Sequence, residues 1–143
     1  MKFENKKISL IILDLYGTLV RADRVDNTPR KGLVDFLERN KREGKKIVLF
    51  TDDNEESAKE VLSDAGVINY FDKLYSRKDL DEDGCKNLLK VCYDFNVSKY
   101  NTVFIGDNGF GRDIASSKKY RVALKIIPQY REKDKFSFKR IVF

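Results

Sequence analysis

Three clusters of polar residues stand directly after short apolar runs, and they hold the side chains best suited to chemistry. They occupy residues 14–18, 51–53 and 106–113. Each contains an aspartate, which can act as a nucleophile, as an acid or base, or as a ligand of a hard cation. The chain has no histidine. Histidine triads and histidine metal sites are therefore excluded, and acid–base chemistry falls to Asp, Glu, Lys, Tyr or Cys.

The apolar runs before these clusters predict buried strands, because nearly continuous apolar runs are typical of parallel strands covered on both faces. Strand-like runs occur at residues 8–13, 47–50, 73–75, 102–105 and 122–127, the last predicted as a core strand. Helical patterns alternate with them between residues 29 and 44, 54 and 66, 85 and 96, and 112 and 120. This alternation predicts right-handed βαβ units in a single domain spanning the chain: a three-layer α/β/α sandwich with a mainly parallel, Rossmann-like sheet.

The edge at which the strands end decides how the polar clusters are interpreted. In such sheets, ligands bind beyond the carboxyl ends of the strands, near the switch in strand order. A single aspartate after an apolar run is more often a turn or cap residue. Three polar clusters at one edge instead favour a functional site, so we expect Asp14, Thr51 and Asp107 to line that edge.

Composition and charge limit the class of protein. The 143 residues, 41% of them hydrophobic, suffice for one compact core. No apolar run approaches the ~18 residues that cross a bilayer, so we expect a cytoplasmic protein with no membrane partner. Cys85 and Cys92 stand seven residues apart in a helical pattern, too far for a disulfide, which predicts two reduced core thiols.

The net charge of +6 suits an anionic substrate or nucleic acid, but a solvated, lysine-rich surface gives the same balance. Residues 129–143 mix basic side chains with four aromatic ones: Tyr130, Phe136, Phe138 and Phe143. This mixture is compatible with base stacking and phosphate contact. Burial of the rings against the sheet or a helix is the commoner outcome, so nucleic acid is the less favoured partner.

Motifs in a fixed order make the chain resemble the haloacid dehalogenase-like hydrolase superfamily over most of its length. The first motif of that family is an apolar strand ending in Asp-x-Asp-Gly-Thr, and residues 14–18 read Asp-Leu-Tyr-Gly-Thr. Its second motif is a strand ending in Ser or Thr, matched by Thr51, and its fourth is an apolar strand followed by Gly-Asp, matched by residues 106–107. The third is a lysine near the start of the helix before the last motif. Lys86 fits best, and Lys78 is the alternative.

The resemblance implies a magnesium-dependent phosphatase acting on a phosphorylated small molecule or macromolecule. It implies that Asp14 attacks phosphorus to form an aspartyl-phosphate, while Thr51 and Lys86 hold the phosphoryl oxygens. Magnesium requires hard oxygen ligands in octahedral geometry. The carboxylates of Asp14 and Asp107, with the main-chain carbonyl of Tyr16, are expected to supply them.

Two departures from the family pattern bear on activity. The family's phosphatases usually carry a second aspartate two residues after the nucleophile, as acid and base, where this chain has Tyr16. A phenol with an ordinary pKa of about 10 is a poor base at neutral pH, which predicts slow or selective turnover. Asp113 comes six residues after Asp107, later than the family's distal acid. It either reaches the metal through water or only caps the following helix.

No segment is long enough for the cap domain that many family members insert over the site. We therefore expect an open site, which in this family goes with macromolecular substrates or with oligomers whose neighbours close it. Three functions stay open. A phosphohydrolase of low or selective activity is favoured over a binding or regulatory module that has lost turnover. A dehalogenase would explain Tyr16, since that class carries tyrosine there, but not the missing cap.

Overall fold

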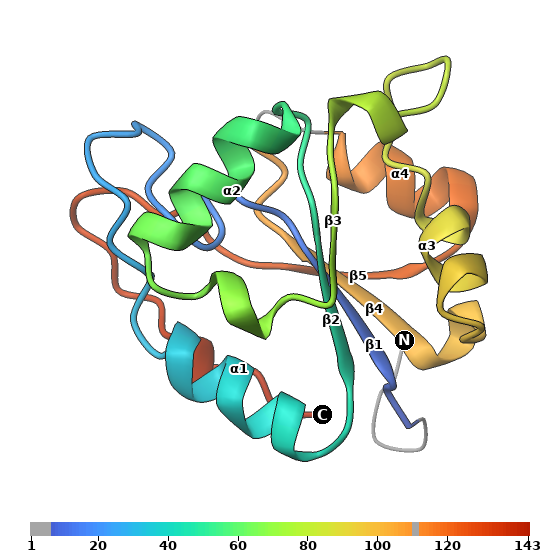
Figure 1. Ribbon diagram of the computed structural model, residues 1–143, viewed down its shortest axis with the longest axis horizontal. Helices are drawn as coiled ribbons and strands as arrows, with labels where there is room; N and C mark the ends of the chain where they lie inside the picture. Colours follow the sequence, from blue (N-terminus) through green and yellow to red (C-terminus); the bar gives the residue numbers. More distant parts are fainter. Residues whose placement is uncertain (1–6, 110–111) are drawn as a thin grey trace.

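A five-stranded, wholly parallel sheet forms the centre of the molecule (Figure 1). The computed structural model describes residues 7–109 and 112–143. The strands are β1 (Leu10–Leu13), β2 (Lys46–Phe50), β3 (Lys73–Tyr75), β4 (Thr102–Gly106) and β5 (Ala123–Ile126). Their order across the sheet is β3-β2-β1-β4-β5. The predicted α/β fold is thus confirmed.

Helices cover both faces of the sheet. The α-helices are α1 (Leu33–Arg42), α2 (Glu55–Asp64), α3 (Leu88–Asp94) and α4 (Asp113–Tyr120). Short 3-10 helices are η1 (Ile68–Tyr70), η2 (Arg77–Asp79), η3 (Lys99–Asn101) and η4 (Phe138–Arg140). Figure 1 shows α1 and α2 on one side of the sheet and α3 and α4 on the other. No helix among the described residues is long and apolar enough to cross a membrane.

The continuous apolar run of β1 follows from its position between these two layers. Ile11 and Leu13 belong to the core cluster that contains the buried side chains of α1 and α2. Leu10 and Ile12 belong to the cluster that contains those of α3. Successive side chains of a strand point to opposite faces, so a strand covered on both faces must be apolar at every position.

Two predicted elements differ from the structure. The run at residues 122–127 was expected to be a core strand, but β5 pairs only with β4 and lies at the edge of the sheet, where Ile126 is 52% exposed. The helix expected from residue 85 begins only at Leu88, after the Asn87 side chain has accepted a hydrogen bond from the Lys90 amide. Cys85 therefore lies outside the helix. Both cysteines are nevertheless free and buried, as predicted.

Two of the four C-terminal aromatic residues pack into the core. Phe136 and Phe138 are buried, and the ring of Phe138 lies 5.1 Å from that of Phe36 on α1. These two rings are therefore not available to stack on nucleic-acid bases. The alternative that the sequence favoured, burial against a helix, describes this segment.

Nothing is inserted over the carboxyl ends of the strands between Asp14 and Asp107. Every residue in this span is described, and together they form β2 to β4, α1 to α3, η1 to η3 and their connecting loops. The expected absence of a cap domain within this span is confirmed.

Candidate active site

Three of the predicted site residues follow neighbouring strands at one edge of the sheet. Leu13 pairs with Leu49 on β2 and with Ile105 on β4. Asp14, Thr51 and Asp107 come directly after these three strands. The order of the strands switches at β1, because the chain continues to β2 on one side and reaches β4 on the other. The predicted clusters therefore meet where such sheets bind ligands. Phe110 and Gly111 of the third cluster lie outside the described residues, as do residues 1–6.

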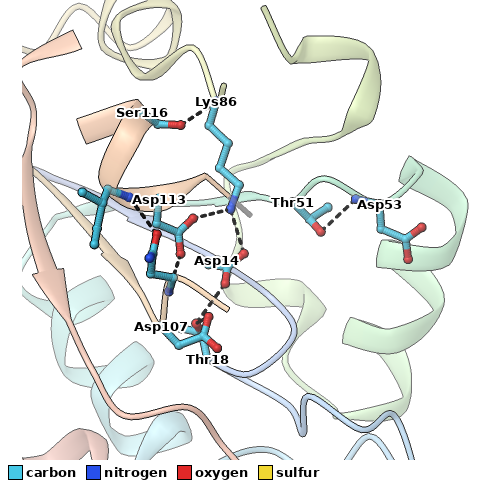
Figure 2. Close-up of polar contacts among 10 residues, drawn as sticks. Asp14, Thr18, Thr51, Asp53, Lys86, Asp107, Asp113 and Ser116 are labelled. Carbon is cyan, nitrogen blue, oxygen red and sulfur yellow. Dashed lines mark hydrogen bonds and ion pairs between the residues drawn. The ribbon is translucent and has the colours of Figure 1, made fainter. Parts of the chain in front are cut away.

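Lys86 places its ammonium group between two carboxylates (Figure 2). Its Nζ lies 2.8 Å from Asp14 Oδ1 and 2.9 Å from Asp113 Oδ1. Only 1% of the Lys86 side chain is exposed. The Lys78 side chain, by contrast, is 67% exposed and pairs with Glu55 at the surface. Of the two lysines that the sequence left open, the structure brings Lys86 to Asp14.

Burial and the Lys86 ammonium together determine the ionisation of this cluster. Burial raises the pKa of Asp14 and of Asp113, and Lys86 acts in the opposite direction. Burial alone would lower the pKa of Lys86, but the two carboxylates outweigh it and hold that pKa above its ordinary value. The lysine is therefore charged at neutral pH.

Thr18 joins the nucleophile candidate to the opposite carboxylate. Its hydroxyl, wholly buried, lies 3.0 Å from Asp14 Oδ2 and 3.2 Å from Asp107 Oδ1, as a donor that the two oxygens share. From the sequence, Thr18 could be placed in the first motif but not assigned a contact. Its partner Asp107 is distant in the chain, which is why sequence reasoning missed this role.

The carboxylates fit a divalent cation. One oxygen each from Asp14, Asp107 and Asp113 lie within 4.8 Å of one another. Asp107 Oδ2 is buried, and no donor among the described residues hydrogen-bonds to it. Gly17 adopts a φ of +80°, and a Cβ there would collide with the Asp107 carboxylate, 2.9 Å from its Cγ. The absence of a side chain at Gly17 thus keeps space open at the unpaired oxygen, where a hard cation would bind.

Asp113 is bound mainly to protein groups. One of its oxygens binds Lys86, and the other accepts a hydrogen bond of 2.9 Å from the Asn108 amide. Asp113 is also the first residue of α4, and its side chain is wholly buried. The structure therefore shows Asp113 as a partner of Lys86, a role that the sequence interpretation did not include.

Tyr16 turns its hydroxyl toward the loop after β2. The hydroxyl donates a hydrogen bond of 3.0 Å to Asp53 Oδ2, and the Arg24 guanidinium stacks 3.8 Å from the centre of the ring. Burial, and next the bond to Asp53, raise the pKa of Tyr16. The phenol is therefore neutral at physiological pH. Asp53 belongs to the second polar cluster, but the sequence assigned it no partner, and its position two residues after Thr51 was the one available signal.

Thr51 is buried, and its Oγ1 accepts a hydrogen bond of 3.2 Å from the Asp53 amide. In the view of Figure 2, Thr51 lies across the Lys86 ammonium from Asp113. The acceptor role leaves the hydroxyl proton of Thr51 free to donate to another group.

The family of the chain follows from a comparison with known families. Residues 5–127 match the sequence profile described as haloacid dehalogenase-like hydrolase. The chain belongs to this family. A comparison with curated proteins finds no match.

Several solved structures share the fold. A predicted phosphoglycolate phosphatase from Haemophilus somnus is 14% identical, with a TM-score of 0.67 over 82% of this chain and 84% of that one. The phosphatase-containing N-terminal part of a Bacteroides fragilis protein, complexed with Mg, is 19% identical, with a TM-score of 0.69 over 88% and 38%. The L-2-haloacid dehalogenase from Xanthobacter autotrophicus is 13% identical, with a TM-score of 0.68 over 88% and 80%. At these identities the likeness shows the fold alone, which both reaction classes share.

Replacing Gly17 by alanine tests the space beside Asp107. Gly44 is a matched control, because it has a φ of +82° but no atom lies within 4 Å of the place that a Cβ would take. Gly44→Ala should lower the free energy of unfolding by roughly 1–2 kcal/mol, the cost of left-handed backbone with a Cβ. Gly17→Ala should lower it by at least as much, because its Cβ also displaces the Asp107 carboxylate. Only Gly17→Ala should weaken magnesium binding, by about ten-fold or more. Calorimetric titration with Mg²⁺ checks this, and equal affinities in the two variants would contradict it.

Replacing Lys86 by methionine tests the buried ion pairs. In Mg²⁺-free buffer at about pH 7, Lys86→Met should lower the free energy of unfolding by about 3–5 kcal/mol, because two buried carboxylates lose their partner. The exposed control Lys78→Met should stay within about 0.5 kcal/mol of the unchanged protein.

The pH dependence of this loss has a definite sign. Since burial raises the pKa of Asp14 and Asp113, the folded variant takes up protons more readily than its unfolded chain. The deficit of Lys86→Met relative to the unchanged protein should therefore shrink as the pH falls below neutral. Urea unfolding at several pH values measures it, and a deficit that grows in acid would refute the assignment.

Proposed function

We propose that the chain is a magnesium-dependent phosphohydrolase that uses Asp14 as its nucleophile. The observation that carries the proposal is the buried Lys86 ammonium, held against Asp14 at 2.8 Å in a cluster of carboxylates that includes the unpaired oxygen of Asp107. An anionic nucleophile and an anionic phosphate repel each other, and a fixed positive charge between them offsets that repulsion. A phosphorylated small molecule or macromolecule is the substrate class that this chemistry serves.

The reaction divides into two displacements at phosphorus. In the first, an Asp14 oxygen bonds to phosphorus while the bond from phosphorus to the leaving-group oxygen breaks. In the second, water attacks the phosphorus of the aspartyl-phosphate, which releases inorganic phosphate and restores Asp14. Lys86 Nζ and the Thr51 hydroxyl donate hydrogen bonds to the phosphoryl oxygens in both steps.

Asp14 and Asp107, with the Tyr16 carbonyl, are the groups that would hold the metal. Bound there, Mg²⁺ would supply positive charge to the phosphoryl oxygens and favour the ionised form of Asp14. Thr18 keeps the two carboxylates at a fixed separation, since its hydroxyl lies within 3.2 Å of both.

Tyr16 leaves the second displacement without a strong base. Its hydroxyl proton is engaged by Asp53, and its pKa is raised, first by burial. The aspartyl-phosphate should therefore persist, and substrates whose leaving groups need little protonation should load the enzyme fastest.

A dehalogenase is the second candidate, favoured by Tyr16 in the first motif and opposed by the lack of an inserted cap. In that reaction Asp14 would attack carbon and displace halide. A binding or regulatory module would keep the cation site without turnover.

A substrate panel with Asp14→Asn separates the three functions. Acetyl phosphate, p-nitrophenyl phosphate and 2-chloropropionate are offered with and without Mg²⁺. We expect Mg²⁺-dependent phosphate release that Asp14→Asn abolishes, because an amide cannot serve as the nucleophile. Halide release independent of Mg²⁺ would establish the dehalogenase, and Mg²⁺ binding without turnover would establish the binding module.

Tyr16→Asp should raise steady-state phosphatase turnover by at least about ten-fold, because a carboxylate can protonate the leaving group and then activate water. The control Tyr16→Phe keeps the ring and removes the hydroxyl, and it should leave turnover nearly unchanged. Rates on p-nitrophenyl phosphate at saturating Mg²⁺ provide the measurement. A Tyr16→Phe variant that loses most activity would show that the phenol itself takes part in catalysis.

A further inference from the structure

The C-terminal segment, residues 128–143, lies beyond the region that matches the family profile, yet it contacts the loop that follows the nucleophile. The Tyr130 amide donates a hydrogen bond of 2.7 Å to the Gly17 carbonyl. The Ala22 amide donates one of 3.0 Å to the Tyr130 carbonyl. The loop between β1 and α1 is therefore held by main-chain bonds on both sides of Tyr130.

Arg30 adds a buried charge to this junction. Its side chain is wholly buried, and its Nε and Nη2 bind the two oxygens of Asp134 at 2.9 and 2.8 Å. The Phe136 ring lies 4.6 Å from the guanidinium carbon. A two-pronged pair of this kind fixes the plane of the guanidinium, because both donors and both acceptors are engaged.

The third nitrogen of the guanidinium, Nη1, points at the first motif. Arg30 Nη1 lies 3.4 Å from the Gly17 carbonyl oxygen and 3.5 Å from that of Thr18. These distances are long for hydrogen bonds, so the attraction is mainly that of a buried positive charge for two carbonyl dipoles. The Thr18 hydroxyl in turn lies against Asp14 and Asp107. A continuous set of contacts thus runs from Asp134 to the two carboxylates.

We propose that Arg30 and Asp134 form a positioning pair for the active site: they set the main chain at Gly17 and Thr18, and thereby the separation of Asp14 and Asp107. The inference rests on the proposed function, since it assigns the pair to the cation and nucleophile site. On this inference, the C-terminal segment helps to set the geometry of that site.

The C-terminal segment also makes contacts with α1 that serve the packing of the fold and not the site. Phe138 packs on Phe36 of α1, and Ile141 accepts a hydrogen bond of 2.9 Å from Arg39 through its carbonyl. Neither contact reaches the loop after β1. Phe138→Leu is the control. It weakens the packing on Phe36, whereas the main-chain hydrogen bond of 2.9 Å from the Phe138 amide to the Lys31 carbonyl is kept and an apolar side chain stays against the Phe136 ring, so the Arg30–Asp134 pair is retained.

The test compares Mg²⁺ affinity in three variants, measured by calorimetric titration with Mg²⁺ alone on the full chain. Asp134→Asn keeps the shape of the side chain and removes its negative charge. Arg30→Lys keeps the positive charge and removes the two-pronged guanidinium. Asp134→Glu keeps the charge and both carboxylate oxygens, displaced by one methylene group. We expect about ten-fold weaker Mg²⁺ binding in the first two, as for other groups that orient metal ligands, and recovery of most affinity in Asp134→Glu. Phe138→Leu should lower the unfolding midpoint and leave Mg²⁺ affinity unchanged.

The outcomes separate this inference from the proposed function. Mg²⁺ affinity in Asp134→Asn and Arg30→Lys that falls no further than in Phe138→Leu would overturn the positioning role, whatever happens to stability. If the unsubstituted protein binds Mg²⁺ but releases no phosphate, the proposed phosphohydrolase function is overturned, and the affinity comparison still tests the Arg30–Asp134 pair. If the unsubstituted protein binds no Mg²⁺, both the proposed function and the positioning role are overturned.

Discussion

The candidate active site depends on one buried ion-pair arrangement, the Lys86 ammonium between Asp14 and Asp113. A charge removed from water must be paired, and an unpaired one destabilises the fold severely. Here the pairing also joins three parts of the chain: the end of β1, the segment before α3 and the start of α4. The Lys86 amide adds a bond of 2.9 Å to Ser116 Oγ on α4. Stability and the geometry of the site are therefore set by the same contacts.

The charge balance of this cluster explains why a divalent cation suits it. Three carboxylates, Asp14, Asp107 and Asp113, stand against one ammonium. If all are ionised, two negative charges remain without a partner in a setting where Asp14 and Asp113 are buried and Asp107 is half-buried. Protonation relieves part of this excess, as the raised pKa values of Asp14 and Asp113 indicate. A divalent cation next to Asp107 would relieve all of it, which ties the cation to the pairing around Lys86.

The sequence predicted the parts of the site that local pattern controls. Asp14, Thr51 and Asp107 could be placed because each follows an apolar run, and parallel strands end at one edge. Contacts between residues distant in the chain could not be predicted, so the partnership of Tyr16 with Asp53 and that of Arg30 with Asp134 were missed. The edge position of β5 was missed for a related reason, since an apolar run does not reveal whether a strand has one neighbour or two. α3 begins late, at Leu88, because Asn87 caps it, and the apolar spacing from residue 85 did not indicate this cap.

The central claim, that Asp14 is the phosphoryl-accepting nucleophile beside a bound cation, is tested most directly by a crystal structure of the chain with Mg²⁺ and beryllium fluoride, a mimic of the phosphoryl group. The account predicts beryllium bonded to a carboxylate oxygen of Asp14, fluorine atoms facing Lys86 and Thr51, and Mg²⁺ against Asp107. Beryllium fluoride bound without a bond to Asp14, or Mg²⁺ bound away from Asp107, would contradict it.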